Sequence, residues 1–344
     1  MKAVISHQRN GGGDMKAVKY VTLTLCTILL VGVLVGFGGT VRDAAAASDY
    51  PNKAISIILG VPPGGSTDMG ARLLAQFMEK QLKQPVVVVN KPGAAATIGG
   101  YAVASAKPDG YTLGYFPGSG SVPEVYSYFY SAPYSSSDLR PISRIHAPVI
   151  AVAVKADAPW NSMKEFREYA RKNPGTKFGH IGKSTTQYVI MSTIIKAEKL
   201  NMVDVPFDGD GTMVPALLGG HVPVGTPVLY VIRSLVEGKK LKVLGVAVQK
   251  RAPSVPDVPT LAELGYKLPF TSFLGMFAPK KTPDEIVKKL EDTIRKVLDD
   301  KEFQEKNRAM DMPVDYDDAA AFEKYLANYK TTAQAFFKEQ GFVK

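Results

Sequence analysis

The segment Val61-Pro-Pro-Gly-Gly-Ser-Thr-Asp68 lies between an apolar, β-branched run, Ile55–Val61, and a stretch with helical spacing, Thr67–Leu82. In that stretch the apolar side chains recur every three or four residues and share one face: Leu73, Leu74, Phe77, Met78 and Leu82. The pattern predicts a strand, a tight glycine turn and a helix. The start of such a helix directs unpaired N–H groups and positive potential at the loop, which favours an anion there. N-capping of the helix by the Ser-Thr-Asp sequence is the alternative interpretation.

The same alternation of strand and helix continues along the chain. Further apolar runs predict strands at Val86–Val89, Tyr111–Phe116, Val149–Val154, Val203–Val205, Val222–Gly225 and Leu241–Val248. Ser162 with Glu165 three residues later predicts a capping box at a helix start. Helical spacing also marks Pro283–Leu298 and Asp318–Gln340. This alternation is typical of an α/β fold with buried parallel strands.

The length of 344 residues predicts two domains. Two places are interpreted as crossings between them: one is Arg140–Ile145, and the other is the proline-rich Pro253–Pro259 with the extended Thr271–Pro279. We expect residues 48–147 and 271–344 to form domain one and residues 148–270 to form domain two. A chain that leaves one domain and returns to it makes a two-lobed clamp with a cleft between the lobes.

The N-terminal segment has the features of an export signal. Lys16 and Lys19 precede an uncharged apolar run, Val21–Phe37, and small residues follow at Ala44–Ser48. We expect a signal peptide over residues 1–47, cleaved near Ala47, and a periplasmic mature protein. A permanent membrane anchor is the alternative, and the sequence leaves open whether the natural start is Met1 or Met15.

Removal of this signal changes the composition. The formal net charge falls from +10 to +7, and the only cysteine, Cys26, is lost with the signal. A mature chain without cysteine excludes disulfides, thiolate nucleophiles and cysteine-ligated metals. Its basic residues are scattered rather than clustered as in nucleic-acid binders. With three scattered histidines and no H-E-x-x-H or G-x-S-x-G motif, we expect no catalytic residues, no metal and no cofactor.

Two further glycine-containing loops follow predicted strands. Gly182-Lys-Ser184 ends like a phosphate-binding P-loop, but Lys177 stands where that motif requires its first glycine. The remaining interpretation of Gly179–Gln187 is a polar helix start that faces the cleft from domain two. The other loop, Asn90–Gly100, lacks the dinucleotide spacing, so a turn that packs a helix on its sheet is favoured over an anion site.

Several blocks in order resemble one family: Tyr50–Ile58, Pro62–Arg72, Asn90–Ala94, Ile98-Gly99, Lys107–Leu113, Leu217–Val222, Lys250-Arg251, Val255–Gly265, Phe277–Pro279 and Thr282-Pro283. Over residues 50–344 the chain resembles the periplasmic solute receptors of tripartite tricarboxylate transporters, the TctC or Bug-type receptors. The resemblance implies a type II-like periplasmic-binding-protein fold of two domains, a Venus flytrap. Such a receptor, which we expect to be a monomer, closes on a small carboxylate and delivers it to membrane permease subunits.

The resemblance also implies a set of ligand-binding residues. The domain-one wall consists of Gly64, Gly65, Ser66, Thr67 and Asp68, with Phe116 and Ser119 reaching the cleft after the strand at Tyr111. The domain-two wall consists of Ser184, Thr185 and Thr186. Asp208 either meets a ligand amine or hydroxyl or caps a turn. The sequence departs from the family pattern before Ser184 and at Pro223, which leaves the ligand preference at the second wall open.

Two other functions fit a two-lobed clamp. It can present its ligand to a membrane signalling protein, or it can be a secreted hydrolase with an unrecognised site. The sequence does not identify the carboxylate, because recognition by backbone N–H groups depends on few side chains.

Overall fold

The computed structural model describes residues 49–248 and 250–342. The expected signal peptide and its cleavage site near Ala47 lie outside these residues. All the elements described below belong to one compact unit that begins at Pro51. Within the described ranges, no helix has both the length and the apolar composition needed to cross a membrane.

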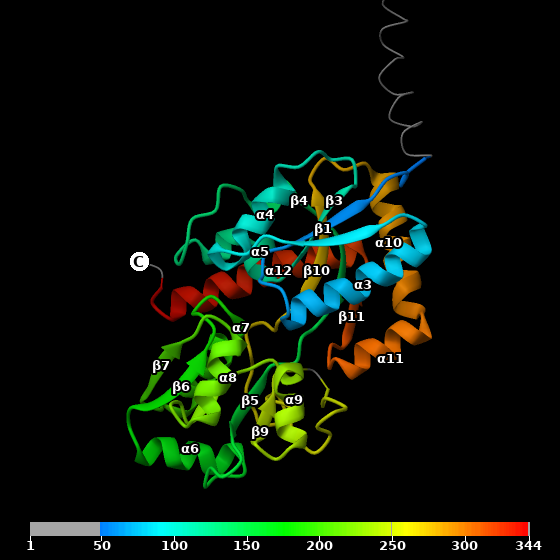
Figure 1. Cartoon of the computed structure of the whole chain (residues 1–344). Coiled ribbons are helices and arrows are strands. Elements are labelled where there is room, and N and C mark those ends of the chain that lie inside the picture. The colour runs from blue at the N-terminus through cyan, green and yellow to red at the C-terminus, as the bar shows by residue number, and fades with distance from the viewer. Residues whose placement is uncertain (1–48, 249, 343–344) are drawn as a thin grey trace, which may run out of the picture. The chain divides into compact units, whose positions relative to one another are not determined.

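The first of two sheets has six strands in the order β11-β4-β10-β3-β1-β2 (Figure 1). Strand β1 runs parallel to β2 and β3, whereas β10 is antiparallel to both of its neighbours, β3 and β4, and β11 is antiparallel to β4. The strands are β1 (Ile55–Leu59), β2 (Val86–Asn90), β3 (Thr112–Phe116), β4 (Leu139–His146), β10 (Leu274–Pro279) and β11 (Val314–Asp317).

The second sheet has five strands in the order β7-β6-β8-β5-β9. Strand β6 is parallel to β7 and β8, and β5 is antiparallel to β8 and β9. The strands are β5 (Ala151–Lys155), β6 (Thr176–His180), β7 (Met202–Pro206), β8 (Val224–Gly225) and β9 (Leu241–Val246). The strands of this sheet come from residues 151–246, and those of the first sheet come from residues 55–146 and 274–317. We propose the division into two domains on the basis of these two separate sheets.

Two stretches that the sequence marks as crossings are strands. Arg140–Ile145 lies within β4 and Thr271–Pro279 contains β10, and the two strands pair with each other. Both sheets are therefore mixed: the expected parallel strands are present in each, and antiparallel strands lie beside them. β4 was not predicted as a strand because its arginines interrupt the apolar pattern. In the structure the Arg144 guanidinium donates to Asp317 Oδ2 at 2.8 Å and to Asp315 Oδ2 at 2.5 Å. These pairings let a strand with an arginine sit inside a sheet.

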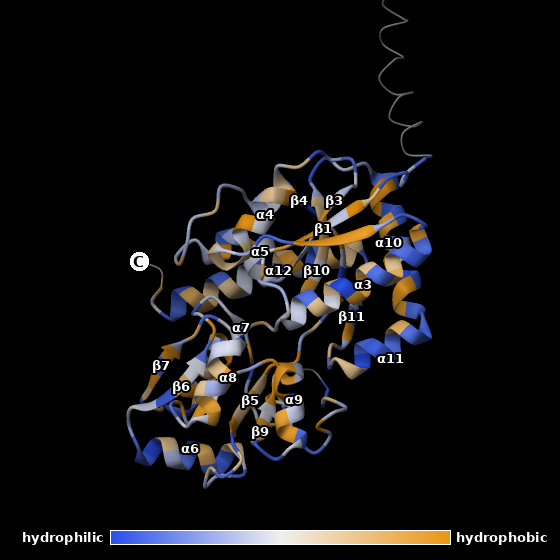
Figure 2. Ribbon diagram, in the orientation of Figure 1, coloured by the Kyte–Doolittle hydropathy of each residue, from blue (hydrophilic) through white to orange (hydrophobic). Residues whose placement is uncertain are grey.

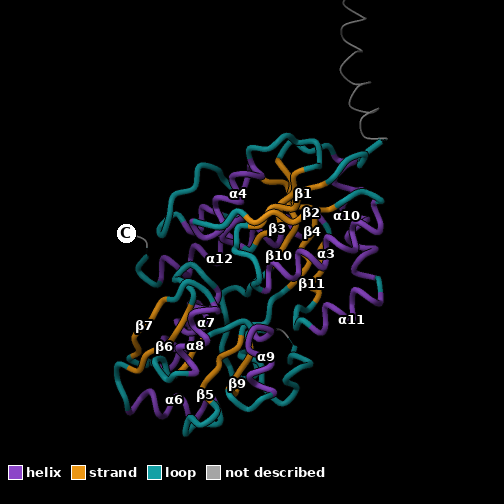
Figure 3. Tube along the Cα trace, viewed as in Figure 1, coloured by secondary structure: helices purple, strands orange, loops and turns teal. Residues whose placement is uncertain are grey.

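The helices and short 3₁₀ turns connect the strands (Figure 3). The helices are α3 (Ser66–Leu82), α4 (Thr97–Ala104), α5 (Gly118–Ser121), α6 (Met163–Lys172), α7 (Thr186–Glu198), α8 (Asp210–Leu218), α9 (Leu229–Glu237), α10 (Asp284–Asp299), α11 (Lys301–Ala309) and α12 (Ala319–Glu339). The turns are η1 (Ala94–Ala96), η2 (Pro123–Tyr126) and η3 (Ser136–Asp138). Ser162 caps α6 as predicted by accepting from the Glu165 N–H, but the Glu165 carboxylate accepts from the Asn161 N–H instead of closing the box on Ser162.

Each sheet has its own apolar core. An aromatic cluster that includes Phe116, Phe273, Phe277 and Phe322 packs on the first sheet, and a cluster that includes Trp160, Phe166 and Phe178 packs on the second. Hydropathy follows this arrangement, because β1 and β2 are mainly hydrophobic while α11 is mainly hydrophilic (Figure 2). The strands thus form a rigid frame from whose ends the glycine loops project.

Candidate functional site

The loop between β1 and α3 leaves the start of the helix open. Gly64 has φ of +87°, a left-handed conformation that favours glycine, and Gly65 is the N-cap residue of α3. No side chain caps this helix, and a Cβ atom built at either glycine would meet nothing within 4 Å. The start of α3 therefore has no side-chain cap, and the space beside its two glycines is open.

The capping alternative raised by the sequence does not describe this loop. Ser66 and Thr67 lie inside the first turn of α3 and are partly buried. In the described part of the chain their hydroxyls make no hydrogen bond. By contrast, Ser162, Asp300 and Asp318 each accept a backbone N–H at the start of α6, α11 and α12. The donors of the first loop are left for something other than the helix itself.

The Asp68 side chain fixes this loop by hydrogen bonds. The residue is 3% exposed, and its carboxylate accepts from the Gly64 N–H at 3.0 Å, from Asn90 Nδ2 at 2.8 Å and from Arg72 Nε at 2.9 Å. Burial by itself would raise the pKa of Asp68, but the bonds from Arg72, Gly64 and Asn90 hold that pKa below its ordinary value. We therefore propose Asp68 as a residue that positions the loop, not as one that touches the ligand.

Neither partner of Asp68 was predicted from the sequence. Arg72 stands four residues after Asp68 on α3, a spacing that brings an acidic and a basic side chain together on a helix, and this signal was available. Asn90 ends β2, next to β1, and only the strand order places it there.

The loop between β6 and α7 has the same plan. Gly182 has φ of +122°, and no side chain caps α7. His180 is fully buried at the end of β6, where its Nδ1 accepts from the Gly182 N–H at 2.9 Å and its Nε2 lies 3.3 Å from Asp204 Oδ2. Burial lowers the pKa of His180 despite the Asp204 carboxylate, so the ring is neutral and holds the loop as Asp68 holds the first.

The residues proposed for the second wall differ in what their hydroxyls do. Thr185 donates to the Gly182 carbonyl at 2.7 Å, so its hydroxyl belongs to the loop. The Ser184 hydroxyl lies close to the hydroxyl of Tyr130. Tyr130 follows η2 and packs against the aromatic cluster of the first sheet, and it was not predicted from the sequence. Thr186 begins α7 and is partly buried.

Ser119, in α5, lies beside the same Tyr130 hydroxyl as Ser184 of the second wall. The hydroxyls of Ser119 and Ser184 both act to lower the pKa of Tyr130, although burial, the larger effect, raises it. Ser119 and Ser184 are separated by 65 positions in the chain and come from loops of different sheets. The structure thus brings together two residues that the sequence assigned to opposite walls.

Phe116 and Asp208 are not placed alike. Phe116 is fully buried and stacks on Phe277 with ring centroids 6.2 Å apart, so it is a core residue rather than a ligand contact. Asp208 is exposed. Two residues on, Asp210 begins α8 with its Oδ1 buried and without a hydrogen-bond partner among the described residues.

The third glycine loop packs α4 on β1, as the sequence favoured. A Cβ atom on Gly99 would lie 2.9 Å from the Gly60 Cα, and one on Gly60 would lie 2.3 Å from the Ala96 Cβ. Only glycine allows this approach of helix and strand.

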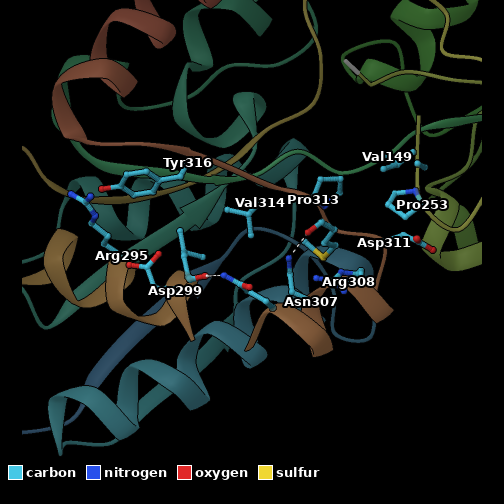
Figure 4. A pocket seen from close by; sticks show the side chains of 14 residues that line it. Val149, Pro253, Arg295, Asp299, Asn307, Arg308, Asp311, Pro313, Val314 and Tyr316 are labelled. Carbon is cyan, nitrogen blue, oxygen red and sulfur yellow. Dashed lines mark hydrogen bonds between the residues drawn. The ribbon is translucent and has the colours of Figure 1, made fainter. Parts of the chain in front are cut away.

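A separate cavity of about 520 Å³ lies away from these loops (Figure 4). Its lining comes mainly from α10, α11 and β11, with Val149 and Pro253 at one end and Arg295 and Tyr316 at the other. None of the residues proposed from the sequence lines it. We assign the candidate site to the loops and not to this cavity, because the loops carry the unpaired donors.

Comparisons with known proteins show the family and the fold of this chain. Residues 70–342 match the TctC family, described as tripartite tricarboxylate transporter family receptor. The chain is 33% identical over 314 residues to the UPF0065 protein of the gbd 5′ region of Cupriavidus necator, which covers 87% of this chain and 91% of that protein.

Two solved structures are similar as well. A TctC solute-binding protein from Polaromonas superposes with a TM-score of 0.70 at 28% identity, over 84% of this chain and 99% of that one. MatC from Rhodopseudomonas palustris, solved with bound malate, gives a TM-score of 0.69 at 25% identity, over 83% of this chain and all of that one. The fold is that of periplasmic solute-binding proteins, and the chain belongs to the TctC family of tripartite tricarboxylate transporter receptors.

Proposed function

We propose that this chain captures a small organic carboxylate in the periplasm and delivers it to the membrane permease subunits of a tripartite tricarboxylate transporter. The observation that carries the proposal is the pair of matching loops. Each runs from a strand through a glycine turn to an uncapped helix start, and each is held by a buried side chain, Asp68 in one and His180 in the other.

The chemistry of the loops suits an anion held by neutral donors. The starts of α3 and α7 offer backbone N–H groups and the positive ends of two helix dipoles. The one carboxylate beneath the first loop is paired with Arg72, so its charge does not repel a bound anion. Donors without a full charge bind a carboxylate reversibly, which a receptor that must release its ligand requires.

The bound malate of MatC supports a carboxylate as the ligand of this chain too. Binding at both walls would favour a conformation in which the two loops approach each other, and the ligand would shift the population toward it. We propose that the protein acts as a monomer. The family is one of solute-binding receptors and not of enzymes.

A thermal-shift screen tests the proposal on the mature chain, residues 48–344. The panel contains malate, succinate, citrate, benzoate and glutamate, and isothermal titration calorimetry follows each positive result. A ligand present at 100 times its Kd stabilises the folded protein by about 2.7 kcal/mol, a readily measured rise in Tm. If no carboxylate in the panel raises the Tm, the proposed function is wrong.

A further inference from the structure

Tyr130 has a buried hydroxyl that the fold does not use. The oxygen is shielded from solvent and makes no hydrogen bond within the described part of the chain. Two other tyrosines of the same segment are satisfied: the Tyr134 hydroxyl donates to the Gly120 carbonyl at 2.6 Å, and the Tyr126 hydroxyl pairs with that of Tyr329. Buried hydroxyls without a partner are rare in folded proteins, so this one needs a reason.

The ring of Tyr130 is held in place by its neighbours. It stacks on Tyr126 with the ring centroids 6.1 Å apart and the planes 13° from parallel. Tyr126 in turn contacts the edge of Phe337 on α12, with ring centroids 5.7 Å apart. A rigid aromatic ring can present its hydroxyl at a fixed point with little loss of conformational freedom.

The hydroxyl lies beside residues of both proposed walls. Tyr130 packs against the apolar cluster that includes Val189 of α7. Burial raises the pKa of Tyr130, and its polar neighbours, Ser119 of α5 and Ser184 of the loop before α7, oppose that rise. Neither serine forms a hydrogen bond of ordinary geometry with it, so three hydroxyls lie together without satisfying Tyr130.

We propose that Tyr130 selects the ligand by donating a hydrogen bond to one of its carboxylate oxygens, with Ser119 and Ser184 as neighbouring donors. A buried phenol stays protonated, so it can donate a hydrogen bond, and that bond is stronger when the acceptor is an anion. The start of α7, which Ser184 precedes, places positive potential next to the same point. This inference rests on the proposed function, because it assumes a carboxylate ligand.

Tyr130→Phe is the direct test, and Tyr128→Phe is its matched control. Tyr128 is in the same segment and 42% exposed, so loss of its hydroxyl should change nothing. The probes are malate, succinate, citrate and glutamate, titrated by calorimetry into the wild-type protein and both variants. For each probe that the wild type binds, we expect Tyr130→Phe to weaken binding at least about tenfold, as for a lost bond to a charged group.

The melting temperature without ligand separates recognition from a structural role. Loss of an unsatisfied buried hydroxyl should leave the Tm of Tyr130→Phe unchanged or raise it. Tyr134→Phe, which removes the bond to Gly120, should lower the Tm. Ser184→Ala provides a second measurement and should weaken the same probes with no change in Tm.

The outcomes are distinct. Wild-type binding with equal affinity in Tyr130→Phe overturns this inference and leaves the proposed function intact. A lower Tm in Tyr130→Phe with full affinity retained shows a structural hydroxyl and also overturns it. If the wild type binds none of the probes, the proposed function fails and the inference fails with it.

Discussion

Asp210 makes the stability of this protein depend on pH in an unusual direction. Its Oδ1 has no hydrogen-bond partner in the described residues, and its Oδ2 accepts only a long bond of 3.4 Å from the Val228 N–H. Burial without a compensating positive charge raises the pKa of this carboxyl from 3.8 to about 6. The folded state therefore binds a proton more tightly than the unfolded state does.

The sign and size follow from linkage. Below pH 4 the carboxyl is protonated in both states and costs the fold little. As the pH rises from about 4 to 6, the unfolded state ionises while the folded state resists, so stability falls. Above pH 6 the full penalty applies, and a shift of roughly two units corresponds to at most about 3 kcal/mol.

Asp210→Asn removes the charge and keeps the shape and the acceptor for Val228. We expect it to raise the free energy of unfolding by up to about 3 kcal/mol at pH 8 and by less than about 1 kcal/mol at pH 4. Urea unfolding followed by circular dichroism at pH 4, 6 and 8 measures both values. The control is Asp208→Asn, whose carboxylate is exposed two residues away and should show no such trend. A gain that is equal at all three pH values, or a loss at pH 8, would refute the reasoning.

Three other predictions concern the loops. Gly65→Val should change the Tm little, because the valine side chain enters open space, and should abolish carboxylate binding in calorimetry, because it fills the proposed anion site at the start of α3. Retained binding would remove the first loop from the site. Ala95→Gly should raise stability in urea unfolding by about 1 kcal/mol, because Ala95 has φ of +52° and glycine adopts that conformation without strain; unchanged or lower stability would count against strain there. Asp68→Asn should lower stability by about 2 kcal/mol at pH 7, since it weakens the bonds that this buried carboxylate accepts from Gly64 and from the half-exposed Arg72, and should weaken carboxylate binding as well. Because the pKa of Asp68 is lowered on folding, that difference should shrink as the pH falls below 4; a constant difference would contradict it.

Local sequence patterns were sufficient for most elements. Apolar runs located β1, β2 and β9, and helical spacing located α3 and α10 to within two residues at each end. These elements bury one continuous apolar face, so their periodicity is a direct record of their surroundings. The predicted range Asp318–Gln340 likewise begins at the N-cap residue of α12, where the Asp318 carboxylate accepts from the Ala321 N–H.

What the sequence could not supply is the pairing of distant segments. β4 and β10 each contain a proline, and the two arginines of β4 pair with carboxylates more than 100 residues away. The site shows the same limit. Glycine loops were visible, but the roles of Asp68 and Phe116 depend on burial, and Tyr130 enters only because the fold sets it beside Ser119 and Ser184.

The position of β10 in the first sheet also bears on when the protein can fold. Strands β3 and β4 flank β10 and pair with it, not with each other. Until residues 274–279 arrive, both therefore present open edges of unpaired N–H and C=O groups toward the same gap. A nascent or truncated chain that ends before Leu274 cannot complete this sheet: it also lacks β11, so β4 has no partner on either side, and the open edges are templates for aggregation. Completion of the first sheet thus waits for the last fifth of the chain, whereas all five strands of the second sheet have been made by then.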